Sequence, residues 1–240
     1  MAGRPRWSLS AVALVALLVL AGCSGLPTTD QQPSAPETTV ENFSYPTGWS
    51  QDGITDLNSA MATHYDTVEN ASRTTRLVIT NDDGNRTVVR TVDVDAGTGS
   101  IRFWDTTLGS YRYAYYSSEG VFEYNPATEE VERQPDENWT TADVALTAGL
   151  ERPLRSLELN ATTTITAEGT TAVRYAVTGI TDPDSVPSDN ASGYVTVSEA
   201  GYVASYDITR GNDEFTRQTT YNLSEFGDAT VTRPSWLPDE

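Results

Sequence analysis

The chain has 240 residues, with 34 acidic residues against 15 arginines, no lysine and a formal net charge of −19. Such an excess of negative charge repels nucleic acid and anionic lipid head groups, so neither is an expected partner. The missing lysine excludes Schiff-base and lysine-base chemistry, and the single cysteine, Cys23, excludes a disulfide framework.

The first 22 residues have the parts of a secretory signal: a positive start at Arg4 and Arg6, then an apolar run from Leu9 to Leu20. That run is shorter than the ~20 residues that a membrane-spanning helix needs. It ends in Leu-Ala-Gly-Cys, which resembles the lipobox of prokaryotic lipoproteins, in which the cysteine is lipidated and becomes the first residue of the mature chain. We therefore expect a lipid on Cys23 to hold the protein at the outer, extracytoplasmic face of the cell membrane. The alternative is a retained or conventionally cleaved signal in which Cys23 has no role.

Removal of residues 1–22 leaves 13 arginines, all 34 acidic residues and a net charge of −21. Self-repulsion of that size is relieved at molar salt, where the Debye length is only about 3 Å. The acid excess, the missing lysine and the abundant threonine resemble secreted proteins of extreme halophiles. Some Asn-x-Ser/Thr triplets are expected to carry glycans, although chance also produces them in such a chain; the candidates are Asn42, Asn70, Asn85, Asn138, Asn160, Asn190 and Asn222.

Residues 23–47 are rich in Pro, Thr, Ser and Gln and lack apolar periodicity, which predicts a flexible tether before a single domain over residues 48–240. Asp52 is predicted to cap a helix with an apolar face at Ile54, Leu57, Met61, Tyr65 and Val68. His64, the only histidine, lies beside that face. A lone histidine on a helix favours a core or boundary residue over a metal ligand.

After Asn70 the apolar residues alternate with a period of two, and Asp82-Asp83-Gly84-Asn85 is typical of a hairpin turn. Strands are predicted as far as Arg133 and again from Thr163 to Arg233, the last one at Thr230–Arg233. Between them lies a predicted helical insertion that starts at Thr140 or Thr141 and is divided or bent at Pro153. Its apolar residues are Val144, Leu146, Leu150, Leu154 and Leu157.

This order predicts a mainly β (α+β) fold: one curled antiparallel sheet, a half-barrel of about 10–11 strands, packed on the N-terminal helix and the mid-chain insertion. The lipobox, helix, strand run, helical break and closing strands resemble the LolA/LppX/LprG type of lipoprotein carrier domain. More narrowly, Tyr45 to Gly48 and Pro234 to Trp236 resemble the Tyr-Pro-x-Gly start and Pro-x-Trp end of uncharacterised haloarchaeal envelope lipoproteins. The resemblance implies a carrier fold and transfers no ligand-binding residue.

Motifs of known catalytic chemistry are missing from the sequence, so we expect no enzyme and no cofactor. A Ser-His-Asp triad would have to use His64, and there is no Gly-x-Ser-x-Gly elbow. Zinc sites need clusters of His or Cys, which the chain lacks. A pair of carboxylates remains open among 34 acidic residues, although solvated surface is the simpler interpretation.

Aromatic residues gather between positions 103 and 124, and they are the candidate ligand-facing residues: Phe103, Tyr111, Tyr113, Tyr115, Phe122 and Tyr124. Tyr111, Tyr113 and Tyr115 alternate and should share one strand face. One hypothesis places that face in a cavity under the first helix, where it binds a lipid or another apolar ligand. The alternative is that the rings pack as core against the same helix, and that the protein docks an envelope protein without a small ligand. The oligomeric state is left open.

Overall fold

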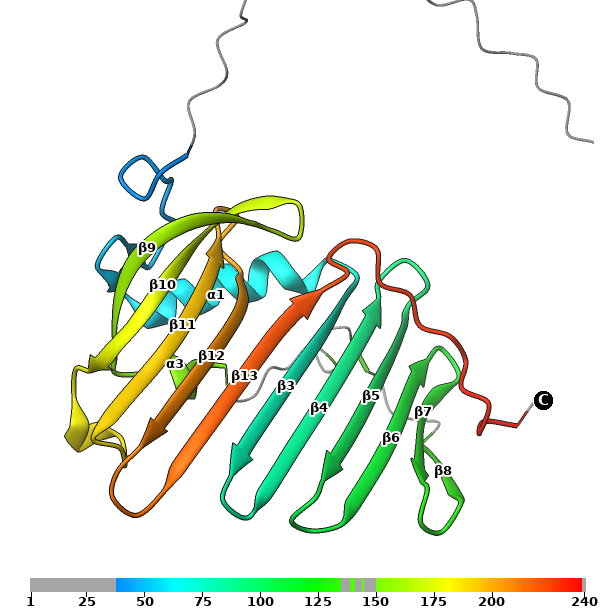
Figure 1. The fold of residues 1–240 in the computed structure, drawn as a ribbon. Helices are drawn as coiled ribbons and strands as arrows, with labels where there is room; N and C mark the ends of the chain where they lie inside the picture. The colour runs from blue at the N-terminus through cyan, green and yellow to red at the C-terminus, as the bar shows by residue number, and fades with distance from the viewer. Residues whose placement is uncertain (1–37, 135–138, 141–143, 145–149, 239–240) are drawn as a thin grey trace, which may run out of the picture. The chain divides into compact units, whose positions relative to one another are not determined.

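The computed structural model describes residues 38–134, 139–140, 144 and 150–238. Two runs of antiparallel strands make up its large sheet (Figure 1). The first run is β3 (Arg73–Asn81), β4 (Gly84–Asp93), β5 (Thr98–Asp105), β6 (Ser110–Ser117), β7 (Gly120–Asn125) and β8 (Glu130–Gln134). The second run is β9 (Leu157–Ala167), β10 (Thr170–Ile180), β11 (Asn190–Ser198), β12 (Val203–Gly211) and β13 (Thr216–Ser224).

Pairing of β3 with β13 joins the two runs into one sheet of 11 strands, in the order β8-β7-β6-β5-β4-β3-β13-β12-β11-β10-β9. Within each run, neighbours along the chain are neighbours in the sheet, as short hairpin connections require. Strands β8 and β9 form the edges, so the sheet does not close into a barrel. The predicted fold class, a curled antiparallel sheet of about 10–11 strands with helical segments, is confirmed.

Helix α1 (Leu57–Glu69) has the predicted face, with Met61 and Val68 buried, but it starts later than predicted. Its N-cap is Asp56, whose Oδ1 accepts hydrogen bonds from the backbone N–H groups of Asn58 and Ser59 at 3.0 and 3.2 Å. The prediction that Asp52 caps the helix and that Ile54 belongs to it is therefore wrong. Ile54 instead pairs with Trp49 in a small hairpin of β1 (Trp49–Ser50) and β2 (Gly53–Ile54).

The residues before α1 pack on the domain. Phe43 is buried, and the Tyr45 hydroxyl donates to the Val40 carbonyl at 2.8 Å. Thr164 Oγ1 in β9 donates to the carbonyl of Thr38 at 2.6 Å. The packed part of the chain therefore includes residues 38–47 as well as residues from 48 onward.

The mid-chain insertion differs from its prediction at its end. Helix α3 (Glu151–Leu154) ends before Ser156, which has a φ of +60°, and Leu157 starts β9 instead of continuing a helix. Val144, Leu150 and Leu154 are buried as predicted, whereas Leu146 lies outside the described residues. A short 3-10 helix, η1 (Pro183–Ser185), lies in the loop before β11. The strand predicted at Thr230–Arg233 is not formed.

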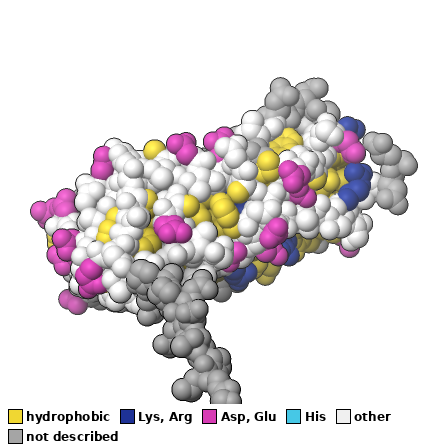
Figure 2. All heavy atoms as spheres, turned by 90° about the horizontal axis from the view of Figure 1, so that it is seen from above, with side chains coloured by type: hydrophobic (Ala, Val, Ile, Leu, Met, Phe, Trp, Pro, Cys, Tyr) yellow, Lys and Arg dark blue, Asp and Glu magenta, His cyan; other side chains and the backbone are white. Residues whose placement is uncertain are grey.

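The main core lies between α1 and one face of β9–β13, which we call the inner face of the sheet (Figure 1). Cα partners in neighbouring strands share a face. The register of the strands therefore places Leu77, Ile79, Phe103 and Tyr221 on the inner face. The opposite, outer face carries Arg76, Arg102, Trp104 and Tyr113. Acidic side chains are spread over the surface seen in Figure 2.

Candidate functional site

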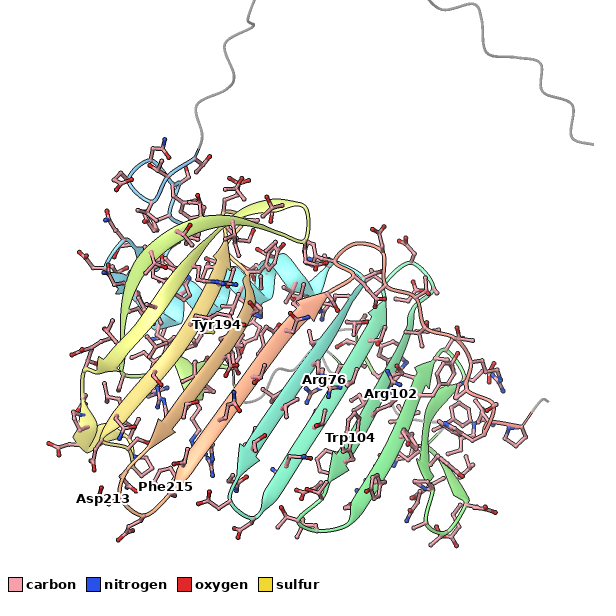
Figure 3. All side chains as sticks on the ribbon, viewed as in Figure 1. Arg76, Arg102, Trp104, Tyr194, Asp213 and Phe215 are labelled. Carbon is pink, nitrogen blue, oxygen red and sulfur yellow. The ribbon has the colours of Figure 1, made fainter. Side chains whose placement is uncertain are left out.

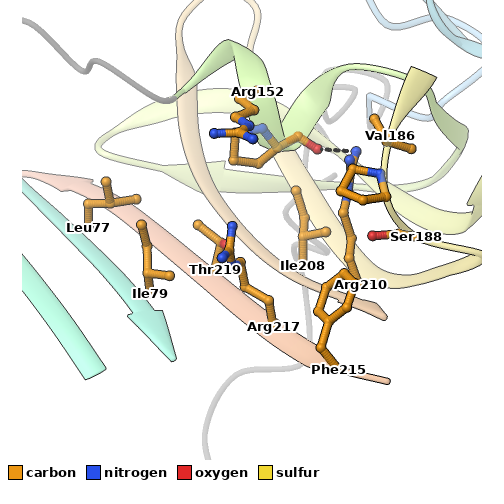
Figure 4. Close-up of a pocket in the computed structure, with 12 residues that line it drawn as sticks. Leu77, Ile79, Arg152, Val186, Ser188, Ile208, Arg210, Phe215, Arg217 and Thr219 are labelled. Atoms are coloured by element: carbon orange, nitrogen blue, oxygen red, sulfur yellow. Dashed lines mark hydrogen bonds between the residues drawn. The ribbon is translucent and has the colours of Figure 1, made fainter. Parts of the chain in front are cut away.

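A groove of about 450 Å³ opens on the inner face where β3 and β12 end and β13 begins (Figure 4). This volume lies within the ~300–1,000 Å³ range of small-molecule sites. Seven of the twelve residues that line it are apolar, namely Leu77, Ile79, Pro153, Val186, Pro187, Ile208 and Phe215. The groove is therefore suited to an apolar molecule of modest size.

The floor of the groove is built by the register of three adjacent strands. At the strand ends, Arg210, Arg217 and Asn81 are Cα partners in one row. The next row inward is Ile208, Thr219 and Ile79. The floor thus changes from charged to mainly apolar over two residues of each strand.

The roof of the groove comes from α3 and from the loop that contains η1. Arg210 ties β12 to this roof, because its guanidinium Nη2 donates to the carbonyls of Pro153 and Arg155, each at 2.6 Å. Its Nε atom is buried and has no hydrogen-bond partner in the part of the chain that the structure describes. Burial lowers the pKa of Arg210 below its usual value, but an arginine pKa is high enough that the group stays charged.

Beyond the groove, the inner face continues into a buried polar cluster. Tyr206 and Tyr221 stack at 5.3 Å between ring centroids, and neither hydroxyl has a hydrogen-bond partner among the described residues. Burial raises the pKa of both phenols, so both remain protonated at neutral pH. Arg73 and Arg90 lie nearby, and burial lowers the pKa of each guanidinium. The space lined by Leu77, Arg90, Tyr206 and Tyr221 has a volume of about 0 Å³, so the cluster forms the inner wall of the site.

The predicted aromatic residues lie away from this groove, and one of them is on the other face from the rest. Tyr113 pairs with Arg102 and Tyr124, and Tyr115 with Ser100 and Phe122, so these rings share the outer face with Tyr111. Phe103 pairs with Arg112 and belongs to the inner face. Figure 3 labels Arg76, Arg102 and Trp104, neighbours of the tyrosines on the outer face.

The C-terminal segment, and not α1, packs on these rings. Tyr115 and Phe122 are buried in a cluster with Leu237, and Trp236 stacks on Tyr124 at 5.2 Å. Tyr111 remains 45% exposed. The idea that Tyr111, Tyr113 and Tyr115 face a cavity under the first helix, or pack on that helix as core, is corrected by the register, because α1 lies on the inner face. Tyr113 and Tyr115 instead line a second groove, of about 400 Å³, beside residues 230–236.

His64 is a buried structural residue. Its Nδ1 accepts a hydrogen bond from the backbone N–H of Val203 at 3.1 Å, which fastens α1 to β12. Burial, with a smaller contribution from the charge of Arg73, lowers the pKa of His64 to about 3. The imidazole is therefore neutral at physiological pH. Among the described residues, no three His, Cys, Asp or Glu side chains come together as a possible metal site.

The remaining predicted sites are on the surface or outside the described residues. Cys23 and Asn138 lie outside them. Asn85 is half-buried, and the other candidate acceptors are exposed, namely Asn42, Asn70, Asn160, Asn190 and Asn222. Within the part of the chain that the structure describes, no helix is both long and apolar enough to span a bilayer.

The groove residues were missed because they come from four separate stretches of the chain, at residues 77–79, 152–153, 186–188 and 208–219. The only local signal is an arginine two positions from an inward-facing residue, in Ile208-x-Arg210 and Arg217-x-Thr219. This spacing places both arginines on the same face as the apolar floor. Which face that is, and that the two strands are neighbours, emerges only from the folded sheet.

Residues 8–240 match the model of a protein family described as a family of unknown function, DUF7537. The chain belongs to this family. The DUF7537 match covers the folded part and most of the predicted signal. A search of the curated proteins finds none with a matching sequence.

Several solved structures resemble this DUF7537 member distantly. The lipoprotein LppX from Mycobacterium tuberculosis is 9% identical, with a TM-score of 0.35 over 73% of this chain and 97% of its own. A LolA superfamily protein from Nitrosomonas europaea is 8% identical, with a TM-score of 0.26 over 75% and 96%. MucB in its complex with MucA is 10% identical, with a TM-score of 0.36 over 75% and 61%. The LolA and LppX likeness expected from the sequence is thus found among the matches, at a level from which we infer neither ligand nor partner.

Proposed function

We propose that the protein is a membrane-anchored extracytoplasmic lipoprotein that binds a lipid or another apolar molecule in the inner-face groove, without catalysis. The groove itself supports this proposal: it is a mainly apolar groove of about 450 Å³ beside the main core. An apolar chain that enters it gains roughly 0.8 kcal/mol for each buried methylene group. The volume suits a single chain better than a lipid with several.

Filling the groove from one strand tests this function. Thr219 is buried and lines the groove, whereas Thr220, the next residue in β13, pairs with Val78 on the outer face. Thr219→Trp should occupy the hollow and abolish binding of a saturated twelve-carbon probe, offered to the protein both as the alcohol and as the fatty acid. Thr220→Trp, the matched control, should leave binding intact.

Isothermal titration calorimetry provides the readout, and thermal melts of all three proteins show whether each is folded. If the wild type binds neither probe, or if Thr219→Trp binds both as well as the wild type does, the groove is not the ligand site. Binding lost in Thr219→Trp alone supports the proposal.

The anchor is proposed from the Leu20-Ala21-Gly22-Cys23 motif. In the full-length protein, Cys23→Ser should move the chain from the membrane fraction to a soluble pool or the medium, because the substitution removes the only attachment point for the lipid. Immunoblots of fractionated cells after a high-salt wash measure this. Retention of Cys23→Ser in the washed membranes would show that another feature holds the protein there.

The outer face favours a second candidate function, docking of an envelope protein. Its aromatic residues continue as Trp104 and Tyr111, with Arg76 placed 5.6 Å from the centre of the Trp104 ring. Aromatic and arginine side chains are enriched at protein interfaces. Cross-linking in the host, compared between wild type and Trp104→Ala, tests this function. Identical cross-linked products from both proteins would argue against docking through this face.

A further inference from the structure

Charge in the groove has the opposite sign from charge in the chain as a whole. The sequence has 34 acidic residues and 15 arginines. The twelve residues that line the groove nevertheless include three arginines, Arg152, Arg210 and Arg217, and no acid (Figure 4). If the groove were ordinary surface of this acidic protein, carboxylates would be expected among its lining residues. The local reversal points to a negatively charged ligand.

Two of these arginines lie directly opposite each other in the sheet. Arg210 in β12 and Arg217 in β13 are Cα partners in the antiparallel ladder, so their side chains leave the same face. Like charges at directly paired positions are destabilising. Neither arginine takes part in an ion pair among the residues that the structure describes. An anion between them would relieve this repulsion.

Arg210 is held in place for such a contact. The hydrogen bonds from its Nη2 to the Pro153 and Arg155 carbonyls fix the guanidinium, while its buried Nε has no hydrogen-bond partner within the described ranges. Arg152 and Arg217 are exposed at the rim and remain able to adjust. Guanidinium groups form strong paired hydrogen bonds with carboxylate and phosphate oxygens.

The order of charged and apolar residues along the floor of the groove fixes how a ligand would be oriented. The arginines lie at the strand ends, and the apolar side chains Ile79 and Ile208 lie one row further in. Resting on the function proposed above, we infer that the groove takes a single-chain anionic amphiphile. Its acidic head group lies between Arg210 and Arg217, within reach of Arg152, and its chain extends inward over Ile208 and Ile79.

Calorimetry with ligands that differ in one part at a time tests this inference. Dodecanoate has both the chain and the charge, dodecanol has the chain alone, and acetate has the charge alone. The wild type should bind dodecanoate about tenfold or more tightly than dodecanol, since one charge-assisted contact is worth about one such factor. Acetate should bind too weakly to detect.

Arg217→Gln is the informative variant, because the hydrogen bonds that hold the roof among the described residues come from Arg210 and not from Arg217. It should lose about tenfold in affinity for dodecanoate and nothing for dodecanol. Arg76→Gln, an exposed arginine on the outer face, is the matched control and should change neither affinity. Without ligand, Arg217→Gln should melt no lower than the wild type, because it removes one member of a like-charged pair.

Each result separates the inference from the proposed function. Equal binding of dodecanoate and dodecanol, unchanged in Arg217→Gln, would overturn the anionic head group and leave apolar binding in place. Failure to bind either one would overturn both. Acetate bound as tightly as dodecanoate would show a simple anion site and overturn the amphiphile.

Discussion

At the scale of single residues, burial decides which polar groups are available for function. His64 and the hydroxyls of Tyr206 and Tyr221 are enclosed by the core, and each is kept in its neutral form. Arg152 and Arg217 are exposed at the groove. The side chains that can meet a ligand are therefore the rim arginines and the apolar floor, and not the lone histidine.

His64→Gln should make stability less dependent on pH. Glutamine can still accept a hydrogen bond from Val203 but cannot take up a proton. The pKa of His64 is about 3 in the folded chain and near 6.5 when unfolded, so the unfolded state binds the extra proton between these values. The contribution of the neutral His64 to the stability of the wild type is therefore complete above pH 6.5 and is lost as the pH falls toward 3.

Chemical denaturation of both proteins at pH 7 and pH 5 measures this effect. Between these values the wild type should lose about 2 kcal/mol more of its unfolding free energy than His64→Gln does. The carboxylates titrate in both proteins, so only the difference between them reports on His64. Equal losses in the two proteins would contradict the neutral, buried imidazole.

At the scale of elements, the periodicity of apolar residues predicts that a helix exists better than it predicts where the helix begins. The spacing of Leu57, Met61, Tyr65 and Val68 predicts α1, but the pattern also admits Ile54, which lies at the same spacing. In the structure Ile54 pairs with Trp49 in a hairpin, and Gly53 has a φ of +108°. The helix therefore begins after Ile54. These contacts with a neighbouring segment cannot be read from a local pattern.

The capping residue of α1 is tested by a matched pair of substitutions. Asp56→Ala removes the acceptor for the N–H groups of Asn58 and Ser59 and should cost about 1 kcal/mol of unfolding free energy. Asp52→Ala removes the same charge from a nearby exposed position and should stay within about 0.5 kcal/mol of the wild type. Denaturant melts of the two variants compare them directly. A larger loss from Asp52→Ala would place the cap where the sequence pattern had suggested it.

For the strands of the candidate site, too, a local sequence pattern predicts only part of the structure. A period of two correctly predicts that Tyr111, Tyr113 and Tyr115 share a face, but it does not say which face receives the helix. Likewise, Arg210 and Arg217 are separated in sequence by a hairpin, and only the β12–β13 register pairs them. The groove therefore follows from register and sheet order, which the sequence alone does not supply.

At the scale of the whole molecule, net charge should control stability. With a formal charge of −19, self-repulsion weakens as salt screens it, so the melting temperature should rise from about 0.1 M to about 3 M salt. Replacing the exposed Glu129, Glu130 and Glu132 with Gln should reduce the size of this rise. A melting temperature that does not change with salt would show that the acidic residues have another purpose.

The central claim, a ligand in the inner-face groove, is tested most directly by native mass spectrometry of protein extracted from the membranes of its own host. Beyond the chain and any covalent modification, the wild type should carry a small apolar molecule, and the same molecule should remain bound to Thr220→Trp. Thr219→Trp, with its groove filled, should lack it. Wild-type protein without added mass, or the same added mass on Thr219→Trp, would contradict the account.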